Sequence, residues 1–366
     1  MSRYEEVRAF AKKSVEPYTT AADKEGRFPK ESFEALRQAG YFSLLVPKEF
    51  GGQGGSMADH TEVCLALAES CATTALCYMM HNVATQSIVA SATEAMKKDK
   101  LPQIAQGKKI MALAFSESGS GTHFYLPEIA AKKEGDKFIL NGRKSFVTTA
   151  RFADEYLVDA NAIGAEGLDI WSVPLGADGI SFEDAAWDGL GMRGNNSMPM
   201  VLNGVTLGER DRIGAAGAGG DSLNNVIAPF FVIGLAAVYS GVATAAQNTA
   251  IEYAKSRKYP DGSVIAEIPT VQEHLAKIYY LTQSARHFTI AAAQKGASAA
   301  ADLFAARINA SENAVEVCRL AMKVGGGNAY AKRLPLERYL RDAYAAAVMA
   351  PSTDVLAIWL GQALSK

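Results

Sequence analysis

The segment at residues 116–123, SESGSGTH, contains the residue types of a phosphate-binding loop. It is dense in glycine and in hydroxyl side chains, and it follows a short apolar run that is typical of a β-strand. The backbone N–H groups of such a loop, together with its hydroxyls, can form a concave site for an anion. Taken alone, the segment is equally compatible with an ordinary Gly/Ser turn.

A second segment, NGRKSFVTTA at residues 141–150, supports the binding-site interpretation, because it carries Lys144, Phe146 and Thr148 close together. Its Asn-Gly pair predicts a hairpin turn. A third segment, GLGMRG at 189–194, satisfies the G-x-G-x-x-G pattern of dinucleotide-binding folds. We reject that interpretation, since no convincing strand precedes the motif and the sequence NNSMPMVLNGV after it is typical of a strand, not a helix.

The periodicity of apolar residues divides the chain into three blocks. Residues 1–108 predict helices, one of which starts at Pro29 and ends at Gly40, followed by a glycine-rich loop at 47–56 and an apolar helix ending near Met80. Residues 109–213 predict a barrel or sandwich of short strands, with hairpins at EGDKF and LNGRK. Residues 221–366 predict helices that form a buried bundle.

The composition narrows the class of protein. A formal net charge of −2 gives no basic field for nucleic acid, and no apolar run reaches the roughly 18 residues that a membrane helix needs. The N-terminus lacks a signal-peptide core, so we expect a cytoplasmic protein. The four cysteines are predicted to be buried free thiols, and the five histidines have no metal-ligand spacing, so we expect no metal.

The closing sequence PLERYLRDAYAAAVMAPSTDV, residues 335–355, resembles the signature of the acyl-CoA dehydrogenase superfamily, roughly P-x-E-R-x-x-R-D-A followed by Tyr-Glu-Gly-Thr. The segments at 116–123 and 141–150 resemble the two flavin-contacting segments of the same family. The resemblance spans nearly the whole chain. It implies an α+β multi-domain fold with an N-terminal helical domain, a central β-barrel or sandwich and a C-terminal four-helix bundle.

The resemblance also implies FAD and the residues that would bind it. Ser116 and Thr148 would hydrogen-bond the flavin pyrimidine edge and N5, Thr122 and the amide of Gly121 would face the pyrophosphate, and Arg257 would reach FAD across a subunit interface. The implied cofactor-binding residues are Phe115, Ser116, Gly121, Thr122, Phe146, Thr148, Arg257, Lys323, Gly326, Gly327, Ser352 and Asp354.

One departure from the family pattern concerns the catalytic base. The position of the usual glutamate is Ala350, and the alternative family position, counted back from Arg257, is Phe231. Neither side chain can accept a proton. Asp354 is a weak substitute because a carboxylate in a helix first turn already suits the macrodipole, and Glu94 is another candidate. The backbone N–H of residue 350 could still bond a thioester carbonyl.

These residues predict an FAD-dependent oxidoreductase that acts on a CoA thioester or similar activated acid by non-standard chemistry, as a flavin oxygenase (monooxygenase) or an elimination enzyme. Two alternatives stay open: an ordinary acyl-CoA α,β-dehydrogenase with a displaced base, and a flavin-retaining binding protein without catalysis. The resemblance further implies a homo-oligomer, either a dimer or a homotetramer, and an electron-transfer or flavin-reducing partner.

Overall fold

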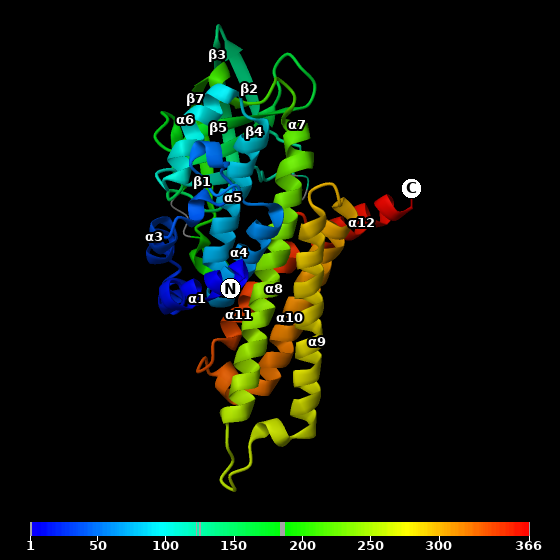
Figure 1. Ribbon diagram of the computed structural model, residues 1–366. Coiled ribbons are helices and arrows are strands. Elements are labelled where there is room, and N and C mark those ends of the chain that lie inside the picture. Colours follow the sequence, from blue (N-terminus) through cyan, green and yellow to red (C-terminus); the bar gives the residue numbers. More distant parts are fainter. Residues whose placement is uncertain (1, 122, 124–125, 184–186, 366) are drawn as a thin grey trace.

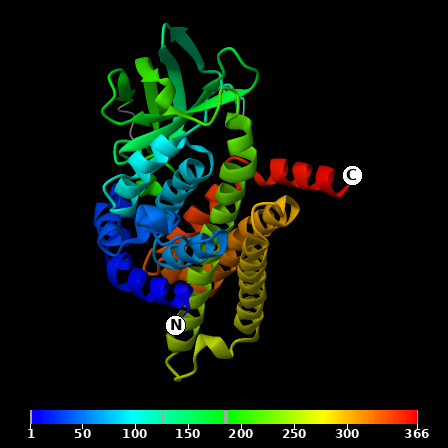
Figure 2. The same ribbon diagram turned by 45° about the horizontal axis from the view of Figure 1, so that its top comes forward.

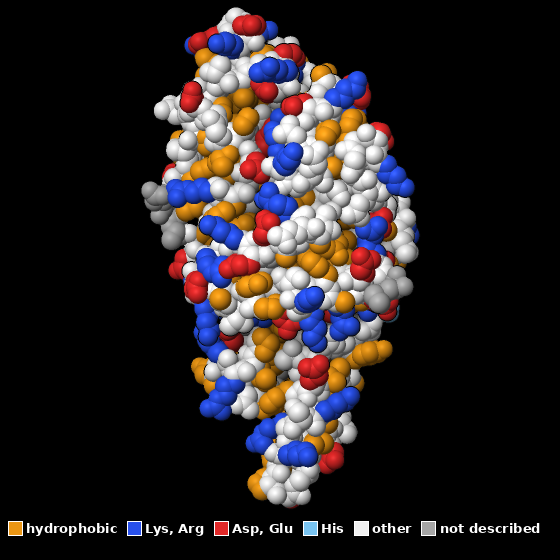
Figure 3. All heavy atoms as spheres, turned by 60° about the vertical axis from the view of Figure 1, so that its left-hand side comes forward, with side chains coloured by type: hydrophobic (Ala, Val, Ile, Leu, Met, Phe, Trp, Pro, Cys, Tyr) orange, Lys and Arg blue, Asp and Glu red, His pale blue; other side chains and the backbone are white. Residues whose placement is uncertain are grey.

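The computed structural model describes residues 2–121, 123, 126–183 and 187–365. Figure 1 shows an elongated molecule with the β-sheet at one end and a bundle of long helices extending to the other. Shorter N-terminal helices lie against both parts. On the face in Figure 3, cationic and anionic side chains are interspersed among apolar ones, in keeping with the small net charge of the chain.

The N-terminal block contains six α-helices: α1 (Arg3–Ser14), α2 (Glu16–Glu25), α3 (Lys30–Gln38), α4 (Met57–Ser70), α5 (Ala72–Ser91) and α6 (Glu94–Ala105). Pro29 caps α3, and Gly40 follows it with φ +75°, in agreement with the expected helix. The prediction of an apolar helix that ends near Met80 is wrong in two respects. It continues to Ser91, and Cys71 interrupts it in an extended conformation, with its sulfur accepting the N–H of Thr74.

The described residues of the middle block form one eight-stranded sheet in the order β6-β7-β3-β2-β4-β5-β8, with β1 paired to β4. The strands are β1 (Met111–Ala114), β2 (Ala130–Glu134), β3 (Lys137–Val147), β4 (Glu155–Asn161), β5 (Leu168–Pro174), β6 (Ile180–Phe182), β7 (Met198–Gly208) and β8 (Arg212–Ile213). The motif at 189–194 leads into strand β7, so its rejection as a nucleotide-binding turn agrees with the structure.

The two hairpin predictions have opposite outcomes. Strands β2 and β3 pair in antiparallel fashion around Gly135 and Asp136, which confirms the hairpin at EGDKF. The hairpin at LNGRK is wrong, because Asn141 and Gly142 lie inside strand β3. Gly142 is needed there because a side chain at that position would collide with Ile129. A local Asn-Gly signal cannot reveal such a non-local contact.

The C-terminal block contains α7 (Gly219–Ser222), α8 (Ala228–Ser256), α9 (Pro269–Lys295), α10 (Ala300–Tyr330), α11 (Leu336–Val348) and α12 (Thr353–Leu364). Helices α8 to α11 pack together as a bundle, and α4 covers α8. The described segment from Gly219 to Ser256 is apolar and long enough to cross a membrane, but 83% of its most apolar window is buried inside the protein. Burial of this kind is typical of a core helix.

Helix α12 is the exception to this compact packing. Figures 1 and 2 show it extending away from the body of the molecule. Only Leu356 of this helix is buried, while Ile358 and Leu364 expose 59% and 74% of their surface. An apolar helix with so much free surface is typical of a contact with another chain.

All four cysteines are buried free thiols, as expected. The pKa of Cys77 is raised to about 12 by burial.

Candidate active site

A cavity of about 70 Å³ lies where the start of α8, strand β1, the end of β3 and the connection between α11 and α12 meet. Ser116 is the one polar residue among the described residues of its wall. The wall is formed by Met80, Leu113, Phe115, Ser116, Phe146, Ile227, Ala228, Phe231, Val232, Ala350 and Pro351. The cavity therefore has apolar walls with one hydroxyl.

Both positions at which the family pattern places a base belong to this wall. Ala350 lies in the connection after α11, and Phe231 lies in the first turn of α8. Two segments distant in sequence thus present hydrocarbon to the same space. No carboxylate occurs among the wall residues that the structure describes.

The two candidate replacement bases lie elsewhere. Asp354 is exposed in the first turn of α12, where Ser352 is the N-cap and accepts the N–H of Val355 at 3.4 Å. Glu94 begins α6, exposes 71% of its side chain and pairs with Lys97 at 3.0 Å. Neither residue lines the cavity.

The two predicted flavin-contacting segments lie side by side at the cavity. The N–H of Ser145 donates to the carbonyl of Ser116 at 2.7 Å, and the hydroxyls of Ser118 and Ser145 are 3.1 Å apart. Phe115, Ser116 and Phe146 line the cavity itself. The sequence placed these residues in two separate motifs, and the fold makes them one surface.

Phe146 is 63% exposed, although it is a large aromatic residue at the end of a strand. Trp187 makes an edge contact with its ring, with the two centroids 6.5 Å apart. The buried indole N–H of Trp187 has no partner in the described part of the chain. An open aromatic face and an unused donor fit a planar ligand with polar edges, which is the character of a flavin ring. Trp187 was not predicted as a site residue, because it belongs to none of the family motifs.

Thr148 and Gly121 are also near this surface in sequence, but they differ in environment. The hydroxyl of Thr148 is buried and lies 2.9 Å from that of Ser197. Gly121 is exposed, has φ +53°, and has free space around its α-carbon. Such a position lets a ligand approach the backbone closely. Thr122 lies outside the described residues.

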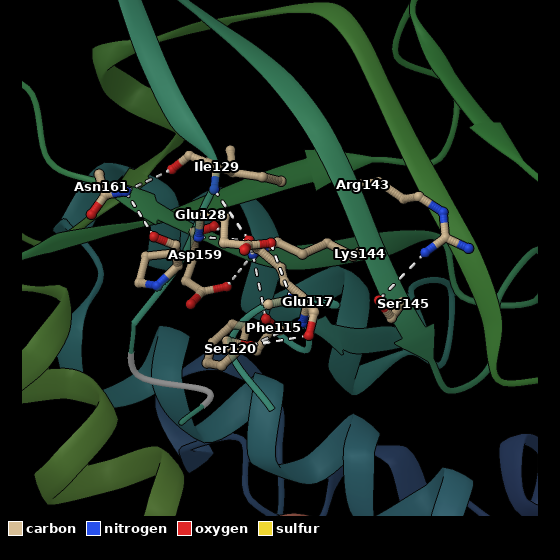
Figure 4. Close-up of polar contacts among 12 residues, drawn as sticks. Phe115, Glu117, Ser120, Glu128, Ile129, Arg143, Lys144, Ser145, Asp159 and Asn161 are labelled. Carbon is tan, nitrogen blue, oxygen red and sulfur yellow. Dashed lines mark hydrogen bonds and ion pairs between the residues drawn. The ribbon is translucent and has the colours of Figure 1, made fainter. Parts of the chain in front are cut away.

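A cluster of three charged residues lies beneath this surface (Figure 4). The ammonium of Lys144 pairs with Glu117 and, at 2.6 Å, with Asp159 on strand β4. All three side chains are almost completely buried. Burial, opposed by Lys144, raises the pKa of Asp159 to about 6. Glu117 and Lys144 belong to the two segments that resemble flavin-contacting segments, whereas Asp159 belongs to neither and was not predicted; its charge within the apolar run EYLVDA was the available signal.

Four other predicted cofactor residues gather at the far end of the bundle. Arg257 follows α8, is exposed, and stacks over Tyr259 at 5.6 Å. Asn328 donates to the hydroxyl of Tyr253 at 2.6 Å, which holds the end of α10 against the end of α8. Lys323, Gly326 and Gly327 belong to the same end of α10, and Gly326 interrupts that helix with φ +50°.

Helix α8 separates this group from the cavity. It contains 29 residues and is therefore about 43 Å long, with Phe231 near its first residue and Arg257 just beyond its last. The fold of one chain does not bring Arg257, Lys323, Gly326 or Gly327 to the cavity.

The fold and the comparison with known proteins together define a flavin-dependent oxidoreductase. Models of the N-terminal, middle and C-terminal domains of acyl-CoA dehydrogenases match residues 3–108, 112–205 and 232–364. The chain belongs to the acyl-CoA dehydrogenase superfamily, and its cofactor is FAD.

Two curated relatives are similar over almost their whole length. The 3-(aryl)acrylate reductase of Clostridium sporogenes is 29% identical, with 95% of this chain and 94% of the relative covered. The short-chain-specific acyl-CoA dehydrogenase of Clostridium acetobutylicum is also 29% identical, with 92% and 90% covered. The butyryl-CoA dehydrogenase of Megasphaera elsdenii matches in structure with a TM-score of 0.93 and 25% identity, over 100% of this chain and 97% of that one.

Proposed function

We propose that this FAD-dependent oxidoreductase acts on a CoA thioester, or a similar activated acid, by a reaction that needs no carboxylate base at the substrate α-carbon. The observation that carries the proposal is the cavity wall, where Ala350 and Phe231 occupy both family base positions. Oxygenation and elimination are the two reaction classes that fit.

The physical reason is the chemistry of α,β-desaturation. A base must stand within roughly 3 Å of the α-proton while a hydride leaves the β-carbon, and losing such a base costs about 10² to 10⁴ in rate. A methyl group and a phenyl ring accept no proton. The candidates Asp354 and Glu94 are exposed to solvent and lie off the cavity wall.

Several groups of this chain still suit a thioester substrate. The N–H of Ala350 precedes Pro351 in the wall and provides a donor for a thioester carbonyl, which would polarise the α-carbon. The hydroxyl of Ser116 is the polar side chain on the opposite segment of the wall. Bound FAD supplies two-electron redox chemistry at this surface, and the apolar wall excludes water from it.

The ordinary dehydrogenase remains the second candidate, because the similar relatives in the two Clostridium species are named as a reductase and a dehydrogenase. A flavin-retaining binding protein is the third candidate.

Anaerobic mixing with a panel of acyl-CoAs, followed through the flavin absorbance, separates these three candidates. Rapid bleaching by straight-chain acyl-CoAs would refute our proposal. Turnover that consumes O₂ in the presence of a reductant, or that releases an eliminated group, would support it. Ligand binding with neither outcome would indicate the binding protein.

We further propose that the protein acts as a cytoplasmic homo-oligomer whose FAD sites are shared between chains. Two features support this: Arg257 and the glycines of α10 lie a helix length from their own cavity, and α12 exposes an apolar surface. A dimer or tetramer would bring the far end of one bundle to the sheet of another. Reoxidation of the flavin would then fall to O₂ or to an electron-transfer partner.

A further inference from the structure

The loop at 116–128 is held at both ends by one buried carboxylate. Glu117 lies at the start of the loop, and its side chain accepts the N–H of Glu128 at 2.6 Å and of Ile129 at 3.2 Å at the loop's end. Figure 4 shows these bonds converging on Glu117. The loop therefore closes on a side chain of its own.

The same carboxylate connects the loop to strand β3. Lys144 of β3 pairs with Glu117 and also donates to the carbonyl of Asp159 at 2.8 Å. Lys144 lies two residues before Phe146, and Glu117 directly follows Ser116. The charged contact thus lies immediately behind the two residues that form the exposed surface of the cavity.

We propose that Glu117 is a positioning residue for FAD: held by Lys144, it fixes the 116–128 loop against strand β3 and keeps Ser116 and Phe146 in the one arrangement that receives the flavin ring. The inference rests on the flavin position proposed above. Asp159 has a different role: among the described residues, its side chain hydrogen-bonds to Lys144 and compensates the charge of the ammonium. Without Asp159, Lys144 would keep Glu117 as a carboxylate partner, whereas without Glu117 the N–H groups of Glu128 and Ile129 would lose their acceptor.

The test is the affinity for FAD, obtained from the fluorescence of the FAD that the purified holoenzyme releases at a series of dilutions. Glu117→Gln keeps the shape of the side chain but loses the charged contacts, and we expect FAD to bind about 10- to 100-fold more weakly, as for other charge-assisted hydrogen bonds. The absorption band of the remaining bound flavin should also change shape. Asp159→Asn should alter the affinity by less than about threefold, because Asp159 bonds to Lys144 and to none of the described residues of the loop.

Glu155→Gln is the matched control. Glu155 is a buried carboxylate on the same strand, β4, paired with Lys100 and, at 2.9 Å, with Lys109, and it makes no contact with the loop. We expect it to lower the melting temperature as much as Glu117→Gln does while FAD affinity stays near that of the unchanged protein. Equal loss of FAD in both variants, or in Asp159→Asn, would overturn the inference, since the effect would then follow from domain stability.

A final variant separates this inference from the proposed flavin position. Ser116→Ala removes a hydroxyl of the cavity wall without touching the charged cluster. If FAD affinity falls in Ser116→Ala but not in Glu117→Gln, the flavin position stands and the role of Glu117 is wrong. If neither variant alters FAD binding or the flavin spectrum, the proposed flavin position itself is wrong.

Discussion

Ala350 and Phe231 line the same cavity, although one follows α11 and the other begins α8. Their proximity means that the two positions at which the family resemblance predicts a base face the same space. In this chain both positions carry an apolar side chain. The cavity can therefore be given a base at either position by a single substitution.

If the proposed function is right, Ala350→Glu should give the cavity a carboxylate base. We expect anaerobic bleaching of the flavin by an acyl-CoA that fits the cavity, at a rate at least about 10² above that of the unchanged protein. Stopped-flow absorbance measures this rate. Ala350→Gln is the control, since it has the same size but accepts no proton at neutral pH. An equal effect of both variants would show that cavity shape, not proton transfer, limits the reaction.

Phe146→Ala should weaken FAD binding about 10-fold, because it removes the exposed aromatic face at the cavity. Phe146→Trp keeps an aromatic face and should stay within about threefold of the unchanged affinity. Titration of FAD-depleted protein with FAD measures both values. Unchanged affinity in the alanine variant would place the flavin away from this ring.

Asp342→Asn should stabilise the protein at pH 7.5. Asp342 is buried and accepts the N–H of Met192 at 2.6 Å. Its pKa is raised to about 6, chiefly by burial, and the charged groups that act on it are Arg338, Arg341 and Asp23. A raised carboxyl pKa makes the folded state lose stability as pH rises from about 4 to 6, and the loss persists above that range. Asparagine keeps the acceptor and has no such dependence.

The expected gain in unfolding free energy at pH 7.5 is about 1 to 3 kcal/mol, and it should vanish near about pH 3, where Asp342 is protonated in both states. Denaturant unfolding at the two pH values measures this difference. Asp23→Asn is the opposite case, since it breaks the ion pair with Arg341 at 2.6 Å and should destabilise the protein at pH 7.5. A gain for Asp342→Asn that is the same at both pH values would contradict the assigned titration.

Complementation between variants should reveal a shared FAD site. Arg257→Glu and Phe146→Ala, each deficient in FAD, alter opposite ends of the molecule. When both chains are co-expressed, mixed dimers contain one site with neither change, so about a quarter of all sites should bind FAD normally. Flavin content per chain measures this fraction. No recovery in confirmed mixed dimers would mean that each chain binds FAD alone.

The sequence predicted the order of helices, strands and helices because each block has its own local periodicity, and it located Ala350 and Phe231 by counting along recognisable motifs. It failed where a distant residue decides the local structure. Gly142 was predicted to form a hairpin turn, but it lies within strand β3, where the distant residue Ile129 leaves no room for a side chain. The sequence did not identify Asp159 as a partner of Lys144, because the two residues pair only once β3 and β4 belong to the same sheet.

Helix α8 is a single buried rod that has Phe231 in its first turn and Arg257 directly after its end. In the proposed assembly this helix would contribute to two active sites. Its first turn would line the cavity of its own chain, and the residue after its end would contact the FAD of a neighbouring chain. A shift of the helix along its axis would then change the cavity of one chain and the FAD contact of the other together. Substrate entry in one subunit would be mechanically linked to cofactor retention in the next.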